Sequence, residues 1–236
     1  MPAAAPCAVP PDPHPGRAPG EGALAAPGPM PAPVVRRLGL SEYEPCWRAM
    51  QRFTDERGSE TPDELWLLEH PPLFTLGMNA STAHVLAPGD IPIVQIDRGG
   101  QVTYHGPGQL VVYPLVDLRR AGLGVRDLVT ALEQSVIDYA ATLGIVAECR
   151  RGAPGVYVEG KKLASVGIRV RRGASYHGIA MNVVNDLEPF KRINPCGYPE
   201  LEMVRLADLC GVGSVAAAQE GLVAHLMRRL YGTGAA

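Results

Sequence analysis

The fold is decided by residues 163–183, which read LASVGIRVRRGASYHGIAMNV. Two runs rich in β-branched and apolar residues, Leu163–Val170 and Tyr176–Val183, predict two strands. The segment 171–173 (Arg-Arg-Gly) between them is a turn signal, so the two strands are expected to pair as a hairpin. Because hairpin strands are antiparallel, a doubly wound parallel sheet is disfavoured.

Outward from this hairpin, the sequence alternates between strand and helix patterns. Ser41 with Glu44 three positions later predicts a capping-box start for a helix that ends near Arg57. Apolar residues at helical spacing predict a helix over 126–143, which Gly144 is placed to cap. Further strands are expected at 34–40, 65–69, 91–96, 110–118, 145–149 and 155–159, and further helices at 204–210 and from Ser214 to about Tyr231.

The mixed order of strands and helices favours a single α/β (α+β) domain with a central mixed β-sheet flanked by helices. A chain of 236 residues suits this reading. Residues 1–33 contain 11 of the 23 prolines and are expected to form a disordered Pro/Ala/Gly-rich tail. The tail lacks the basic start and apolar run of a secretory signal. The catalytic domain is therefore predicted to span 34–236.

Composition narrows the classes of function. The formal net charge is −2 and no basic stripe is visible, so nucleic acid is not an expected partner. The apolar stretches are far shorter than the roughly 20 residues that a membrane-spanning helix needs. The five cysteines are scattered without a CxxC pair, so neither a metal site nor a disulfide framework is expected. We expect a cytoplasmic protein.

The segment Arg98–Gln109, RGGQVTYHGPGQ, lies between two predicted strands and combines glycines with polar side chains. Glycines let a backbone approach a ligand closely, which favours a pocket for an apolar substrate with one polar end. The alternative is a wide turn whose Gly and Pro serve geometry alone. Neither GxxxxGK[ST] nor GxGxxG is present, so no nucleotide cofactor is expected.

Cys196 lies in the predicted loop 193–199, INPCGYP, and is a candidate nucleophile. A loop on a rigid scaffold is a common place for catalytic residues, although a lone cysteine is often only structural. A thiolate is favoured beside a cation. The chain has 19 arginines but only three lysines, and Lys161 and Lys162 are neighbours. Either lysine is a candidate partner, because an amine can exchange a proton where a guanidinium cannot.

Four segments together carry a resemblance to a known family. Arg98–Gln109, 160–169 (GKKLASVGIR), 176–183 (YHGIAMNV) and Ile193–Tyr198 resemble, in order, the motifs of the lipoyl(octanoyl) transferases, the LipB family. The likeness extends from about Val34 to Tyr231. It implies the fold shared with biotin- and lipoate-protein ligases. After Tyr198 the chain departs from the family's pattern of a small residue and a Met–Thr helix entry.

The resemblance implies transfer of octanoyl from octanoyl-acyl carrier protein to a lysine of a lipoyl domain. Acceptors would be the E2 subunits of 2-oxoacid dehydrogenases and the glycine cleavage H protein, and the enzyme is expected to be a monomer without a cofactor. Cys196 would carry the acyl thioester, and Lys162 would favour its thiolate and then accept a proton. The implied substrate-binding residues are Arg98, Gly99, Gly100, Gln101, Val102, Thr103, Tyr104, His105, Ser165, Val166, Gly167, Gly178, Ile179 and Ala180.

Three other functions remain open from the sequence. An ATP-dependent lipoate or biotin ligase on the same fold would not require Cys196. A non-catalytic lipoyl-domain binding protein would not need Lys162 either. A thioesterase would release the free acid, with water in place of the acceptor lysine.

Overall fold

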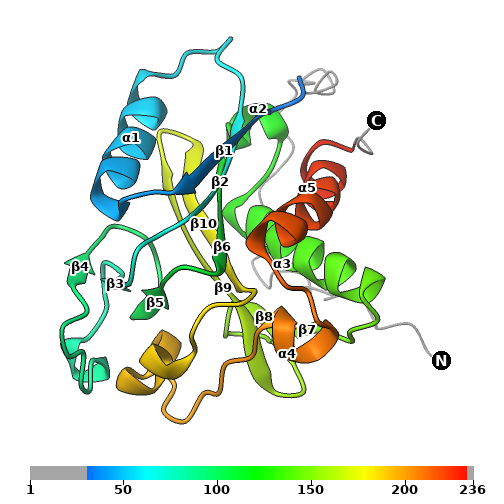
Figure 1. The fold of residues 1–236 in the computed structure, drawn as a ribbon. Coiled ribbons are helices and arrows are strands. Elements are labelled where there is room, and N and C mark those ends of the chain that lie inside the picture. Colours follow the sequence, from blue (N-terminus) through cyan, green and yellow to red (C-terminus); the bar gives the residue numbers. More distant parts are fainter. Residues whose placement is uncertain (1–30, 233–236) are drawn as a thin grey trace, which may run out of the picture.

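The computed structural model describes residues 31–232, which are organised around a seven-stranded mixed sheet (Figure 1). The strands are β1 Val34–Leu40, β2 Glu64–Glu69, β3 Leu73–Leu76, β4 Ile93–Gln95, β5 Thr103–His105, β6 Gln109–Leu115, β7 Glu148–Cys149, β8 Gly155–Val158, β9 Lys161–Arg171 and β10 Ala174–Asn182. The α-helices are α1 Tyr43–Glu56, α2 Leu118–Ala121, α3 Val125–Thr142, α4 Leu206–Cys210 and α5 Val215–Tyr231, and the 3-10 helices are η1 Thr82–His84, η2 Glu188–Arg192 and η3 Pro195–Gly197.

The large sheet has the strand order β1-β2-β6-β10-β9-β8-β7. β1 runs parallel to β2, and the other neighbours pair antiparallel. α1 lies on one face of the sheet, and α3 and α5 lie on the other (Figure 1). The predicted mixed sheet with flanking helices is confirmed.

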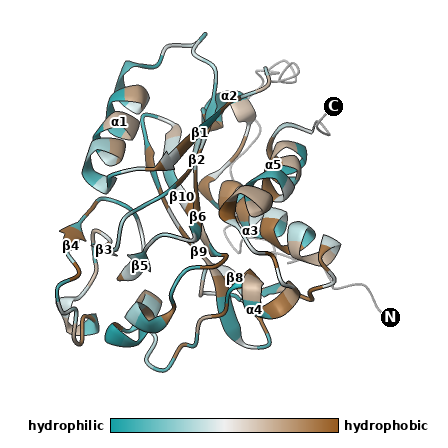
Figure 2. Cartoon of the chain, viewed as in Figure 1, coloured by the Kyte–Doolittle hydropathy of each residue, from teal (hydrophilic) through white to brown (hydrophobic). Residues whose placement is uncertain are grey.

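Alternation along β2 explains why both faces are covered. Leu65 and Leu67 pack with α3 and α5, whereas Trp66 and Leu68 pack with α1. Figure 2 shows apolar segments on the central strands and on α3 and α5. A strand buried on both faces needs such a continuous apolar run, and this pattern produces two cores on opposite sides of one sheet.

A second sheet, of order β4-β3-β5, was not expected. The segment 98–109, predicted as one loop, contains β5 and the first residue of β6. The Val-Thr-Tyr run inside the glycines has strong β preference, which explains the strand. β3, at Leu73–Leu76, was missed because its four residues follow two prolines.

The β9–β10 hairpin agrees with the prediction and turns at Arg172 and Gly173, which have φ of 55° and 86°. Two residues with positive φ are the signature of a type I′ turn. A second two-residue turn joins β8 to β9. Only Glu159 and Gly160 turn, and Lys162 is already in β9, where a side chain stands perpendicular to the sheet.

Two predicted helix caps are confirmed and one is wrong. The Ser214 side chain accepts a hydrogen bond from Ala217 N, and Gly144, with φ of 78°, follows the end of α3. The expected capping box at Ser41 is absent: its hydroxyl donates to the Leu38 carbonyl, and Glu42 takes the N-cap position without a side-chain cap hydrogen bond. α1 begins at Tyr43, one residue later than that box implies.

The division into a tail and one domain stays a prediction, since residues 1–30 lie outside the described part of the chain. Between residues 31 and 232, no helix is both long and apolar enough to cross a membrane.

Asp63 joins several elements at the edge of the sheet. Its Oδ1 atom accepts from Arg57 and Arg120, at 2.6 Å each, and Tyr231 donates to Oδ2 at 3.3 Å.

Because removal of one partner leaves buried charges unpaired, we expect Asp63→Ala to lower the free energy of unfolding by about 3–5 kcal/mol in urea titrations. Glu220→Ala, which breaks an exposed pair, should cost less than about 1 kcal/mol. Equal losses of unfolding free energy in Asp63→Ala and Glu220→Ala would contradict the stabilising role given to Asp63.

Candidate active site

Lys162 and Cys196 meet although they are 34 residues apart in the chain. Lys162 Nζ lies 3.1 Å from Cys196 Sγ and donates a second hydrogen bond, of 2.8 Å, to the carbonyl of Pro154. Its ammonium also lies 5.2 Å from the centre of the Tyr157 ring. The three donors of the ammonium are thus directed at a sulfur, a carbonyl and an aromatic face.

The backbone around Lys162 fixes its side chain. Its N–H donates to Glu202 O and its carbonyl accepts from Val204 N, so the segment after Cys196 pairs with β9. Gly155 opposite provides the space, because a Cβ there would lie 2.5 Å from Lys162 Cε. Lys162 is consequently buried completely.

Cys196 is half-buried and has a strained backbone. Its φ is 57°, in the left-handed region, and Gly197 follows with 80°. Such a conformation costs a non-glycine residue of order 1–3 kcal/mol, and it persists where the surroundings hold it. Here Cys196 N donates to Val102 O at 3.0 Å, and Gly197 N donates to Asn194 O at 2.9 Å. In this conformation the thiol lies within hydrogen-bonding distance of Lys162 Nζ.

The charge of Lys162 depends on the state of Cys196. Burial opposes the charge and by itself lowers the pKa of Lys162. Cys196 and Tyr157 outweigh burial, so the pKa of Lys162 is raised above its usual value. Without a negative charge on that sulfur, burial would remain and the pKa of Lys162 would be lower. One lysine can therefore serve first as a cation and then as a base.

A cavity of about 410 Å³ opens beside this pair, and we call it the central cavity. Such a volume is within the range of small-molecule pockets. Its mouth and walls include Val125 and Val129 of α3, which the sequence did not indicate. The predicted residues that line it are Arg98, Gly99, Gly100, Gln101, Thr103, His105, Lys162, Ser165, Val166, Gly167, Gly178, Ile179, Ala180 and Cys196.

Two predicted binding residues, Val102 and Tyr104, do not line the central cavity. Both side chains pack in a small core with Phe74 and Phe190. Alternation along β5 explains this, since its neighbours Thr103 and His105 face the cavity. Val102 still contributes through its carbonyl, which holds Cys196.

Arg98 lines the central cavity, and both of its terminal guanidinium nitrogens donate to the protein itself. It donates to the carbonyls of Gly99 and Gln101 and to both oxygens of Thr75, at 2.7–2.9 Å. Gly167 leaves room for this side chain, because a Cβ there would lie 2.9 Å from Arg98 Cδ. Arg98 therefore shapes the glycine-rich segment.

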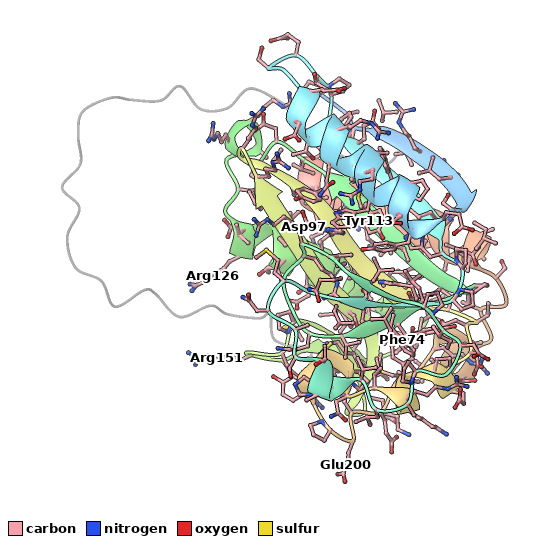
Figure 3. The ribbon with its side chains drawn as sticks, turned by 90° about the vertical axis from the view of Figure 1, so that its left-hand side faces the viewer. Phe74, Asp97, Tyr113, Arg126, Arg151 and Glu200 are labelled. Atoms are coloured by element: carbon pink, nitrogen blue, oxygen red, sulfur yellow. The ribbon has the colours of Figure 1, made fainter. Side chains whose placement is uncertain are left out.

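Tyrosines and histidines form the part of the central cavity beneath α1. Tyr43 and His105 stack with ring centres 5.9 Å apart, and His70 Nε2 lies 2.8 Å from the Tyr113 hydroxyl. Figure 3 shows Asp97 and Tyr113 beneath α1. Tyr43, Tyr113 and His105 line the central cavity, and His70 packs against these three rings without lining it. These residues come from separate elements, and nothing local in the sequence joins them.

Asp97 holds His177 at the same end of the central cavity. The carboxylate accepts from Tyr176, Trp47 and Gln51 and lies 2.9 Å from His177 Nε2. Although burial opposes its charge, hydrogen bonds from His177 and Tyr176 lower the pKa of Asp97 below its usual range. The other ring nitrogen, Nδ1, is buried without a hydrogen-bond partner among the described residues.

Buried histidines make the fold sensitive to acid. Burial lowers the pKa of His70 to about 4 and that of His105 to about 3, from the usual 6.5. Below pH 6.5 these histidines become protonated in the unfolded chain but stay neutral in the folded chain. Their contribution to folding stability is therefore fully present above that pH and is lost as the pH falls. We expect the free energy of unfolding to drop by up to about 1.4 kcal/mol per pH unit per histidine. Equal stability in urea at about pH 7.5 and about pH 5 would contradict this.

The fold of this chain is the one found in lipoate- and biotin-protein ligases. A solved lipoate-protein ligase A bound with ATP has a TM-score of 0.69 at 15% identity, covering 84% of this chain and 85% of that chain. A bi-partite lipoate protein ligase from Thermoplasma acidophilum gives 0.64 at 17% identity, covering 84% of each. Biotin protein ligase from Aquifex aeolicus gives 0.51 at 14% identity, covering 83% of this chain and 68% of that chain.

The chain belongs to the lipoyl protein ligase A/B catalytic domain family, whose model matches residues 42–227. It is 58% identical to an octanoyltransferase of Alkalilimnicola ehrlichii over 212 residues, which cover 89% of this chain and 99% of that protein. It is 59% identical to an octanoyltransferase of Xanthomonas campestris over 201 residues, which cover 85% of this chain and 86% of that protein. The family indicated by the four motifs is confirmed.

Proposed function

We propose that this protein transfers an octanoyl group from octanoyl-acyl carrier protein to a lysine of a lipoyl domain through a thioester on Cys196. The observation that carries the proposal is the 3.1 Å approach of Lys162 Nζ to Cys196 Sγ beside the central cavity. The identity to octanoyltransferases supports the acyl group and the reaction class. The E2 subunits of 2-oxoacid dehydrogenases and the glycine cleavage H protein are the proposed acceptors.

In the first step, the Cys196 thiolate attacks the carbonyl carbon of the donor thioester. A carbon–sulfur bond to Cys196 forms, and the bond to the carrier thiol breaks. The departing thiolate takes a proton from the Lys162 ammonium, which leaves an acyl-enzyme with a neutral lysine beside it. Burial favours this neutral amine once the negative sulfur is gone.

In the second step, the neutral amine of the acceptor lysine attacks the Cys196 thioester. An amide bond forms, Cys196 leaves as a thiolate, and Lys162 accepts the proton that the acceptor nitrogen loses. The pair returns to thiolate and ammonium, so no nucleotide is consumed. The acyl chain is held by apolar walls such as Val111, Ile179 and Ala180, and each buried methylene contributes about 0.8 kcal/mol.

The test is the intact mass of the purified protein after incubation with octanoyl-acyl carrier protein, without ATP and without acceptor. We expect a gain of one octanoyl group that hydroxylamine removes and that an added lipoyl domain accepts. No gain, with lipoyl-domain modification only from ATP and free octanoate, would identify a ligase instead. An adduct that yields only free octanoate would identify a thioesterase.

A further inference from the structure

One peptide group, between Pro154 and Gly155, is held from both sides. Its carbonyl accepts the 2.8 Å hydrogen bond from Lys162 Nζ, and its N–H donates to Glu133 Oε1 at 2.6 Å. In a planar trans peptide these two groups point in opposite directions. Glu133 and Lys162 therefore bind the same planar peptide group from opposite sides.

Glu133 is an unusual residue for its position. It lies on α3 at only 8% exposure, one turn after Val129 of the central cavity and next to Leu132 of the core. Burial raises the pKa of its carboxyl, while the Gly155 N–H and the charge of Lys162 act in the opposite direction. Burying a carboxylate costs desolvation free energy unless hydrogen bonds or an opposite charge compensate for it. Glu133 takes no part in either step of the proposed mechanism.

We propose that Glu133 is a positioning residue that holds the Pro154–Gly155 peptide against Lys162 and supports the ammonium beside Cys196. The inference rests on the proposed function for its purpose, although its geometry does not. A carboxylate that accepts from the N–H polarises the peptide, so its carbonyl becomes a stronger acceptor for Lys162. The negative charge also acts directly on Lys162, because the interior screens it weakly.

The backbone conformation of Gly155 allows both hydrogen bonds of this peptide to form. Its φ of 133° and its lack of a Cβ let the peptide turn its carbonyl toward Lys162. Gly155 still pairs in register with Ser165 of β9, and the register shifts only beyond Val156, before Tyr157. The hydrogen bond to Glu133 is therefore made at the last regular step of the β8–β9 ladder before this irregularity.

Several charged or titratable groups surround Lys162, and the test must separate Glu133 from them. Lys161, the neighbouring lysine, forms an exposed ion pair with Glu202 at 2.6 Å. The groups that face Lys162 or its partners are Glu133 on α3, Tyr157 on β8, Cys196 on η3, Arg98 beside Cys196, and Arg150 on the Tyr157 ring.

The scarcity of lysine permits a direct measurement. With only three lysines in the chain, lysine labelled with ¹³C at Cε gives three signals, and single Lys→Arg variants assign them. We would titrate these signals in the full-length Cys196→Ala protein, in which no thiolate competes with Glu133. Glu133→Gln keeps an oxygen for the Gly155 N–H and removes only the charge.

We expect Glu133→Gln to move the titration midpoint of Lys162 to lower pH by about half a unit or more, because the ammonium loses a nearby negative charge. Glu202→Gln is the matched control and should lower the midpoint of Lys161 alone. An unchanged Lys162 midpoint in Glu133→Gln would overturn the proposal. If that variant does not fold, Glu133→Asp should give a smaller shift in the same direction, and no shift would again overturn it.

A second measurement uses the protein with Cys196 intact. Glu133→Gln should form the octanoyl adduct about threefold more slowly or worse at neutral pH, which matches half a pKa unit. An unchanged adduct rate would overturn the functional part of the proposal. Should the wild type form no adduct at all, the proposed function fails, while the NMR titration still decides the role of Glu133.

Discussion

Cys196→Ala is expected to reduce octanoyl transfer at least about a thousandfold, since the substitution removes the sulfur that is proposed to carry the thioester. Two other free cysteines among residues 31–232, Cys46 and Cys210, are not placed to substitute for Cys196. Burial raises the pKa of Cys46 to about 12, so that thiol stays protonated in the core under α1. Cys210 lies on α4, and neither of these two sulfurs lines the central cavity.

The measurement is a single-turnover assay with octanoyl-acyl carrier protein and a lipoyl domain, followed by mass. Cys210→Ala is the control for loss of a thiol and should keep wild-type transfer, because its side chain is exposed. Cys196→Ser probes the nucleophile itself. A hydroxyl is a poorer nucleophile than a thiolate, so normal transfer by this variant would argue against a thioester intermediate.

The hairpin and the helix caps show which parts of the fold a sequence specifies locally. Arg172 and Gly173 require no distant partner to form their turn, and the helical period of α3 is also local. The capping box expected at Ser41 did not form, because α1 takes Glu42 as its N-cap, and the Ser41 hydroxyl donates to the Leu38 carbonyl. Short strands such as β5 were missed, since three residues acquire their strand geometry from pairing with β3.

The residues of the candidate site also differ in whether the local sequence indicates them. Cys196 and Lys162 were found through motifs, because both lie in segments whose residue order is itself informative. Tyr43 and Tyr113 were missed, since they come from a helix and a strand that look like ordinary core. The binding role expected of Arg98 stays a prediction, and its hydrogen bonds to Thr75, 23 residues away, could not be read from the local sequence.

Lys162→Arg is expected to lower overall transfer by about 10²- to 10⁴-fold, the usual contribution of a positioned proton carrier. Arginine keeps the positive charge but does not give up a proton at working pH. The site also has no spare room, because Lys162 is fully buried and Gly155 already lacks a Cβ to accommodate it.

Separate measurement of the two half-reactions sharpens this prediction. Because a guanidinium can still favour the thiolate, adduct formation on Cys196 should fall less than delivery to the lipoyl domain, which needs a base. Lys161→Arg is the matched control, since this neighbour is half exposed and paired with Glu202, and it should transfer at nearly the wild-type rate. Near-normal delivery by Lys162→Arg would exclude Lys162 as the base and leave it only the electrostatic role beside Cys196.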